Sequence, residues 1–266
     1  MSTEVTFLAI AVGNTRTTIA AITAGEVTAQ TVLPSSSAAD IVDAALSFWA
    51  DLNTEVGQIV MAATNEEAAK SIADALGDQT SRDIWQIGKD LPAPIGQHLD
   101  PETLTGIDRL LNAAAAWDEH QQACVVVDAG TCVTIDFVDG EGTFHGGAIA
   151  PGAQAQMNAM HNDTSALPEV TFEAPLKEAF GKNTAQAMLQ GVFHGIRGMV
   201  RQLTEQYAIR YGAYPMVIAT GGDAMVLFDD DELIERIVPD LQLQGMITSV
   251  RHMVAPEEAD ATTSDE

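Results

Sequence analysis

Two glycine turns in this sequence carry residue types that bind phosphate. Gly13 is followed by Asn14 and Thr15, and Gly130 is followed by Thr131; each turn lies between two apolar, β-branched segments. A glycine lets backbone N–H groups approach a phosphate closely, and neighbouring hydroxyl or amide side chains add donors. One such turn is typical of an ordinary hairpin. Two of them facing each other in a duplicated protein would form a clamp around a triphosphate.

A third turn and an acid–arginine pair could complete such a site. Gly221-Gly222 follows an apolar segment and suits the adenosine end of a nucleotide, although an isolated Gly-Gly is usually only a turn. Asp108-Arg109 stands at the start of an expected helix. Asp108 there can simply stabilise the helix by interacting with its macrodipole. Alternatively, it can act as a base while Arg109 binds a substrate carboxylate. The residues alone favour the structural interpretation.

The elements that position these residues form two similar series. Apolar alternation and helical spacing predict strands over 5–12, 15–23, 27–33, 58–63 and 83–87, with helices over 38–52 and 66–76, the second ended by Gly77. After a helix over 107–120, the pattern restarts. We expect strands over 123–128, 132–138, 142–149 and 216–220, and helices over 154–161 and 183–211.

An internal repeat supports this division. Placing Gly13 over Gly130 aligns an apolar strand, a glycine turn, a hydroxyl-bearing residue and a second strand in both halves, and sets Ala11 opposite Asp128. We therefore expect an α/β protein with two like-folded domains, 1–121 and 122–255, facing each other across a cleft. An acidic and polar tail over 256–266 is expected to be disordered.

Charge and composition narrow the functional classes. The chain has 38 acidic residues against 12 Lys and Arg, a formal net charge of −26. Such a surface repels nucleic-acid phosphates and anionic lipids, so we expect neither a nucleic acid nor a membrane as partner. The apolar run 5–12 is too short to span a bilayer, and nothing resembles a signal peptide. These features indicate a cytoplasmic protein.

The few cations and the metal-binding residue types complete the inventory. Arg16, Arg109 and Lys182 fall beside glycine- or aspartate-containing motifs, where a small anionic substrate could use them. The two cysteines, Cys124 and Cys132, lie in apolar segments and are predicted to be buried, reduced thiols. The six histidines lack paired ligand spacing, so no zinc site is expected. His145 is interpreted as a loop residue, and Asp136 and Asp223 as turn or strand-end residues.

In order and spacing, the motifs of this chain resemble those of type III pantothenate kinases over residues 10–245. Each motif is modest alone, and the series is specific. The matching segments are Val12-Gly13-Asn14-Thr15-Arg16, Gly106-Ile107-Asp108-Arg109 with Asn112, Asp128-Ala129-Gly130-Thr131, Gly146-Gly147-Ala148-Ile149-Ala150-Pro151-Gly152, Gly181-Lys182-Asn183-Thr184 and Ala219-Thr220-Gly221-Gly222-Asp223-Ala224.

This resemblance implies a fold, an activity and a set of ligands. The fold would be a duplicated ribonuclease-H-like domain of the actin-like ATPase type, forming a homodimer with pantothenate near the subunit interface. The activity would be ATP-dependent phosphorylation of pantothenate to 4′-phosphopantothenate, the first step of coenzyme A biosynthesis. Mg²⁺ and a monovalent cation, K⁺ or NH4⁺, would assist the transfer.

The resemblance also assigns roles to individual residues. Asp108 would be the catalytic proton acceptor, Asp128 would bind the monovalent cation, and Thr131 would contact ATP. The residues implied to hold pantothenate are Gly106, Ile107, Asp108, Arg109 and Thr184. Those implied to line the ATP phosphates are Ala11, Val12, Gly13, Asn14, Thr15, Arg16, Thr17 and Thr18.

One position departs from the family pattern. Ala11 stands where the family carries an aspartate that helps to position hydrated Mg²⁺. Because Mg²⁺ is held by only one or two protein carboxylates, the loss of one is serious. Three interpretations remain open: an active kinase in which Asp108, Asp128 or water compensates; a silent nucleotide- or pantothenate-binding homologue with a regulatory role; or an engineered variant of an active enzyme.

Overall fold

The computed structural model describes residues 4–52 and 57–254, which divide into two compact units. Unit 1 contains the described residues up to Pro94 together with those from Met246 onward, and unit 2 runs from Ile95 to Gly245. This division differs from the boundary expected after residue 121. The helix over 107–120 packs on strands of unit 2, and a C-terminal helix crosses the unit boundary. The expected tail over 256–266 lies outside the described residues.

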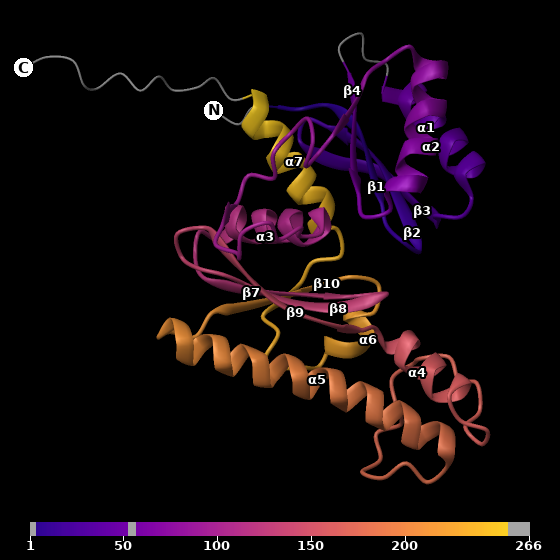
Figure 1. Cartoon of the computed structure of the whole chain (residues 1–266), viewed down its shortest axis with the longest axis vertical. Coiled ribbons are helices and arrows are strands. Elements are labelled where there is room, and N and C mark those ends of the chain that lie inside the picture. Colours follow the sequence, from indigo (N-terminus) through magenta and orange to yellow (C-terminus); the bar gives the residue numbers. More distant parts are fainter. Residues whose placement is uncertain (1–3, 53–56, 255–266) are drawn as a thin grey trace, which may run out of the picture. The chain divides into compact units, whose positions relative to one another are not determined.

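Unit 1 is built on a five-stranded sheet with the order β3-β2-β1-β4-β5. Its central strand β1 is buried along its whole length and lies parallel to β4, which explains why both are continuous apolar runs. Helices α1 and α2 contact each other in Figure 1 and contribute Ile41, Ile72 and Leu76 to the core. The elements of this unit are β1 Phe7–Val12, β2 Arg16–Thr23, β3 Glu26–Pro34, α1 Ala38–Leu52, β4 Gln58–Ala63, α2 Glu66–Thr80 and β5 Ile84–Gln86.

Unit 2 is built on a six-stranded sheet with the order β11-β10-β7-β8-β9-β6. Helix α3 covers one face of the sheet and the long helix α5 covers the other (Figure 1). The core lies on the α5 side, where Val127 and Ile135 of the sheet meet Leu189 and Ile196 of α5. The elements are β6 Gly96–Gln97, α3 Ile107–His120, β7 Cys124–Ala129, β8 Cys132–Val138, β9 Thr143–Pro151, α4 Ala153–Asn162, α5 Thr184–Tyr211, β10 Met216–Thr220, α6 Ala224–Phe228 and β11 Arg236–Ile237, followed by α7 Leu241–Val254 at the unit boundary.

The two sheets repeat one topology, as the internal repeat predicts. The order β3-β2-β1-β4-β5 of unit 1 corresponds to β9-β8-β7-β10-β11 of unit 2, with β6 added at the edge. The register corrects one detail of the repeat. Ala11 pairs with Thr18, whereas Asp128 pairs with Thr134, so the first turn is one residue longer. The structural counterpart of Asp136 is therefore Ala20.

Several local predictions are wrong for identifiable reasons. Helix α2 does not stop at Gly77 but continues to Thr80, where Ser81 adopts a left-handed cap and its N–H bonds the Gly77 carbonyl. Cys132 is exposed because it begins β8 directly after the turn, while Cys124 is buried as predicted. Helix α7 was not predicted. The strands β6 and β11 were also not predicted, because two-residue strands carry no periodicity.

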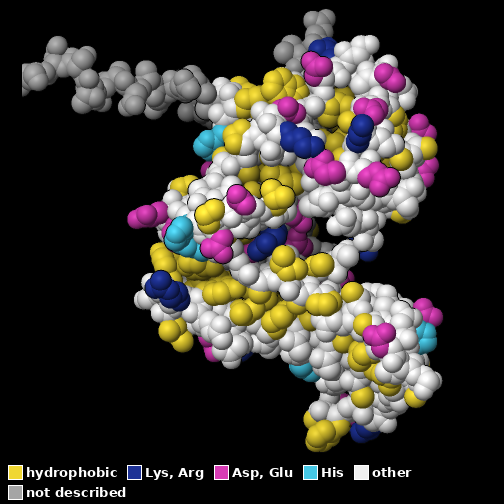
Figure 2. Space-filling view, in the orientation of Figure 1, with side chains coloured by type: hydrophobic (Ala, Val, Ile, Leu, Met, Phe, Trp, Pro, Cys, Tyr) yellow, Lys and Arg dark blue, Asp and Glu magenta, His cyan; other side chains and the backbone are white. Residues whose placement is uncertain are grey.

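The acidic composition is visible on the surface. In Figure 2, Asp and Glu side chains are scattered over the visible face more widely than Lys and Arg. In the described ranges, no helix is both long and apolar enough to cross a membrane.

Candidate active site

The first glycine turn, in unit 1, is held by buried hydroxyl groups. The Gly13 N–H donates to the Arg16 carbonyl at 3.0 Å, and a Cβ at Gly13 would lie 2.7 Å from that oxygen. The Ser35 hydroxyl donates to the Gly13 carbonyl at 2.8 Å and lies 3.0 Å from the Thr17 hydroxyl. Thr17 is fully buried, so its hydroxyl supports the turn from within. Ser35 belongs to no recognisable sequence motif, so only the structure reveals that it supports the turn.

The outer part of this turn presents amide, hydroxyl and guanidinium groups. Asn14, Thr15 and Arg16 are exposed. Ala11 is buried between its strand neighbours and brings no carboxylate to the turn. The expected contacts of this segment with ATP stay a prediction, as does the clamp between the two turns.

The second glycine turn, in unit 2, lies where three backbone turns converge. The Gly130 N–H donates to the Cys132 carbonyl at 2.9 Å. The Gly152 N–H donates to the Thr131 carbonyl at 3.0 Å, and a Cβ there would lie 2.7 Å from that oxygen. Gly221 has a φ of 95°, and its Cβ would lie 2.5 Å from a carboxylate oxygen of Asp128. These close approaches require glycine, and they leave Thr131 exposed beside Asp128.

Helix α3 brings its first turn to the end of β7. The Asn112 amide donates to the Asp128 carboxylate at 2.9 Å. Asp108 stands one helical turn before Asn112 and therefore on the same side of the helix. Its carboxylate accepts from the Arg109 N–H at 2.9 Å, as expected near a helix N-terminus. The structure thus groups Asp108 and Asp128, which the sequence placed 20 residues apart.

Arg109 binds a carboxylate that sequence reasoning had set aside. Its Nε lies 3.0 Å from Oδ2 of Asp136, and its Nη2 contacts Oδ1 of the same residue. Asp136 is only 2% exposed and sits within β8, so its assignment to a turn or strand end is wrong. The available signal was an acidic residue in the middle of an apolar strand, which requires a buried partner.

Asp108, Asp128 and Asp136 form a cluster of acids in which the ionised forms are unfavourable. Burial raises the pKa of Asp108 and of Asp136, the latter in spite of Arg109. Burial and, next, the charge of Asp108 raise the pKa of Asp128 to about 6. One arginine cannot balance three ionised acids, so the cluster would be stabilised by a further positive charge.

The surroundings of Asp128 fit an oxygen-preferring cation. The side-chain oxygen of Asn112, Oδ1, is buried and has no hydrogen-bond partner in the described structure. It belongs to the same amide that bonds Asp128, so a carboxylate and a carbonyl-type oxygen stand together. Hard cations select such ligands. Within the described ranges, no three His, Cys, Asp or Glu side chains form a metal-binding group.

A cavity of about 420 Å³ opens beside this cluster within unit 2. Arg109 lines it together with His98, Phe144 and His145. His145 belongs to β9 and bonds Asp139 at 2.7 Å, so its interpretation as a loop residue is wrong. The cavity brings a guanidinium and two imidazoles to a space large enough for a small organic acid.

Thr184, expected to contact the substrate, is exposed and lies at the far end of α5 from this cavity. Tyr207, near the other end of α5, reaches the Ile135 carbonyl and packs on Phe137, beside Asp136. From Thr184 to Tyr207 the helix rises by about 35 Å. One chain therefore does not bring Thr184, at the start of α5, to Arg109, in the first turn of α3.

Comparison with known proteins adds an independent line of support. A family model described as type III pantothenate kinase matches residues 7–206. A type III pantothenate kinase of Ruegeria pomeroyi is 32% identical over 252 residues, covering 92% of this chain and 96% of the relative.

Solved structures resemble this chain in fold. A Campylobacter jejuni protein described as belonging to the Baf family of transcriptional activators superposes with a TM-score of 0.62 at 20% identity, covering 93% of this chain and 98% of the other. MreB 5 of Spiroplasma citri, solved with AMPPNP, gives 0.51 at 9% identity, covering 92% and 95%. These likenesses show the actin-like fold alone.

Proposed function

Because the chain belongs to the type III pantothenate kinase family, we propose that it transfers the γ-phosphoryl group of ATP to the primary hydroxyl of pantothenate. The product, 4′-phosphopantothenate, enters coenzyme A biosynthesis, an activity that we place in the cytoplasm. The observation that carries this proposal is the grouping of Asp108, Asn112 and Asp128, with Arg109 facing an adjoining cavity.

The residues of the cluster suit each part of this reaction. The pantothenate hydroxyl attacks the γ-phosphorus, its proton passes to Asp108, and the bond to the β-phosphate oxygen breaks to release ADP. The raised pKa of Asp108 makes it a better proton acceptor than an exposed aspartate. Arg109 projects from the next position of the helix, about 100° around its axis, and binds the carboxylate at the other end of the substrate.

Positive charge has to balance the phosphates and the three acids. Mg²⁺ bound to ATP would supply part of it, and a monovalent cation held by Asp128 and the free oxygen of Asn112 would add a further positive charge beside the acids. Phosphoryl transfer through a loose transition state depends mainly on alignment and on such neutralisation. We propose K⁺ or NH4⁺ for this position.

The distant position of Thr184 supports a homodimer. If Thr184 contacts pantothenate, it has to reach the cavity of a second copy, because its own helix carries it away from Arg109. Leu176 and Phe180, in the segment preceding α5, are 60% and 79% exposed, and such side chains are commonly covered by a partner. We therefore propose a dimer whose two copies complete each other's substrate sites.

The test is an ADP-release assay with ATP, Mg²⁺, K⁺ and pantothenate, in which the product is identified by mass spectrometry. We expect pantothenate-dependent ADP release, reduced about 10²–10⁴-fold in Asp108→Asn because the proton acceptor is lost. Equal ADP release with and without pantothenate, or an active Asp108→Asn variant, would contradict the proposal.

The alternative of a silent binding homologue rests only on Ala11, and the family match does not favour it. Pantothenate binding without turnover in the same assay would support that alternative.

A further inference from the structure

Unit 2 contains a buried carboxylate, that of Asp136, and the unfavourable free energy of burying its charge must be offset by a partner. Strand β8 alternates, so Ile135 and Phe137 face the core while Asp136 faces the opposite side of the sheet. An unpaired charge at 2% exposure would be strongly unfavourable. Asp136 is paired side-on with Arg109 through Nε and Nη2. Such fork-to-fork pairs fix the plane of the guanidinium as well as its position.

The neighbouring strand is shaped to admit this pair. Gly147 of β9 lies opposite Asp136, and a Cβ there would overlap the Ile135 carbonyl oxygen and lie 2.7 Å from the Asp136 Oδ1. A side chain at that position would displace the backbone of β8 and crowd the carboxylate that bonds Arg109. On its other side the guanidinium lies 5.5 Å from the ring centre of Phe144. The pair is therefore confined by a glycine and by an aromatic ring.

The pairing with Asp136 leaves donors of Arg109 available to a ligand. The contacts made within the described chain use Nε and Nη2, and Nη1 keeps its donors. Arg109, Phe144 and Gly147 all line the cavity of about 420 Å³. The donors that a substrate carboxylate would need are thus held in place before the substrate arrives, which reduces the entropy lost on binding.

We propose that Asp136 is the positioning residue for Arg109 and that it sets the selectivity of the site for a substrate bearing a carboxylate. This inference rests on the proposed function and adds a residue to it. Asp136 does not touch the substrate; it acts through the guanidinium alone.

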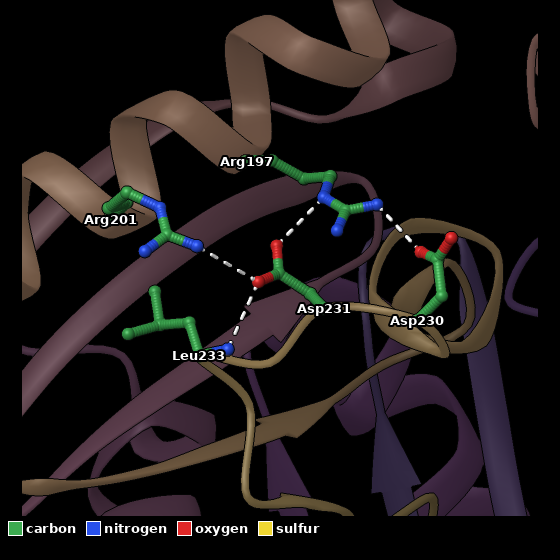
Figure 3. A network of polar contacts seen from close by, with 5 residues as sticks. All are labelled: Arg197, Arg201, Asp230, Asp231 and Leu233. Atoms are coloured by element: carbon green, nitrogen blue, oxygen red, sulfur yellow. Dashed lines mark hydrogen bonds and ion pairs between the residues drawn. The ribbon is translucent and has the colours of Figure 1, made fainter.

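A second buried aspartate–arginine pair in unit 2 provides a matched comparison. Asp231 is 7% exposed and bonds Arg197 at 2.7 Å and Arg201 at 3.3 Å, while the Leu233 N–H donates to it at 3.1 Å (Figure 3). These contacts tie α5 to the segment after α6. None of these residues lines the cavity beside Arg109. Asp231 therefore serves as a control for the general effect of breaking a buried pair.

The experiment measures the binding of two ligands by calorimetry: pantothenate, and the analogue in which its carboxylate is replaced by a neutral primary amide. Asp136→Asn is expected to weaken pantothenate binding by about 10–100-fold, the range for a misplaced charged hydrogen bond, and to leave the amide within about threefold of wild type. Asp231→Asn is expected to lower the melting temperature while leaving both affinities unchanged.

A double-mutant cycle separates positioning from general damage. If Asp136 acts through Arg109, Asp136→Asn should have no further effect on pantothenate affinity when combined with Arg109→Gln. The double variant also removes both buried charges, so it remains informative if Asp136→Asn alone fails to fold. Equal losses for the two ligands, or a further loss in the double variant, would overturn the inference. Failure of wild type to bind pantothenate would instead overturn the proposed function.

Discussion

The two glycine turns stand on the same strand topology but carry different chemistry. Each follows the central strand of its sheet, with an antiparallel partner on one side and a parallel one on the other. At the equivalent positions of the two copies, unit 1 has Ala11 and Ala20, whereas unit 2 has Asp128 and Asp136. All four positions are buried or nearly so. The two units share the backbone topology of a duplicated domain, and only unit 2 has acids at these two positions.

The difference follows from what surrounds each turn. Burying a carboxylate requires a donor or a cation, and α3 supplies both: Asn112 bonds Asp128, and Arg109 bonds Asp136. The first turn is supported by neutral hydroxyls, from Ser35 and Thr17, which need no counter-charge. A strand position becomes an acidic site only where a neighbouring element compensates it.

The largest expected effect comes from restoring an acid to the first turn. Ala11→Asp should raise kcat by about 10²–10³-fold with ATP and Mg²⁺, because one preorganised electrostatic contact is commonly worth that much. The apo protein should become less stable, since the new carboxylate is buried. Steady-state kinetics over a Mg²⁺ titration and thermal melting measure the two effects.

Ala11→Asn is the matched control, since asparagine has the size of aspartate but no charge. An equal gain in both variants would show that shape rather than metal binding is responsible. No gain in Ala11→Asp would mean that the acids of the second turn already suffice for catalysis.

Much of the fold, and part of this comparison, follows from sequence. Helices α1 and α3 have the predicted bounds, because their apolar spacing is regular. The repeat itself revealed Ala11 opposite Asp128. It could not reveal Ala20 opposite Asp136, because the first turn is one residue longer and this shifts the second strand.

Other parts of the site depend on contacts between distant segments. Asp136 bonds an arginine 27 residues earlier on a helix, and Ser35 bonds a carbonyl 22 residues earlier. Neither distance leaves a periodic signal in the sequence. Only the family resemblance assigned Asp108 and Asp128 to one active site, because a family pattern carries spatial information that single residues do not.

A smaller effect is expected from neutralising the acid of the second turn. Burial and the charge of Asp108 raise the pKa of Asp128 to about 6, above the 3.8 of an ordinary aspartate. The folded protein thus holds the proton more tightly than the unfolded chain, and wild type loses stability as pH rises from about 4 through 6. Asp128→Asn should be about 2–3 kcal/mol more stable than wild type near pH 8 and lose that advantage near pH 4.

Denaturant titrations at pH 4 and pH 8 measure this difference in unfolding free energy. Repeating them with added KCl tests whether a cation relieves the buried charge. K⁺ should stabilise wild type at pH 8 more than it stabilises Asp128→Asn, because the cation relieves the buried charge. Equal stability of the two proteins at both pH values would show that Asp128 is not destabilised by its surroundings.

The smallest effects distinguish the two turn glycines themselves. A Cβ at Gly13 would lie 2.7 Å from the Arg16 carbonyl oxygen, whereas a Cβ at Gly130 would meet no atom within 4 Å. Gly13→Ala should therefore cost about 1–3 kcal/mol of unfolding free energy through overpacking, and Gly130→Ala should stay within about 0.5 kcal/mol of wild type. If Gly130→Ala nevertheless weakens ATP binding, its glycine serves the approach of a phosphate and not the packing of the protein. If ATP binding is also unchanged, the second turn acts through Asp128 and Thr131 alone. That result would contradict a phosphate-binding role for Gly130.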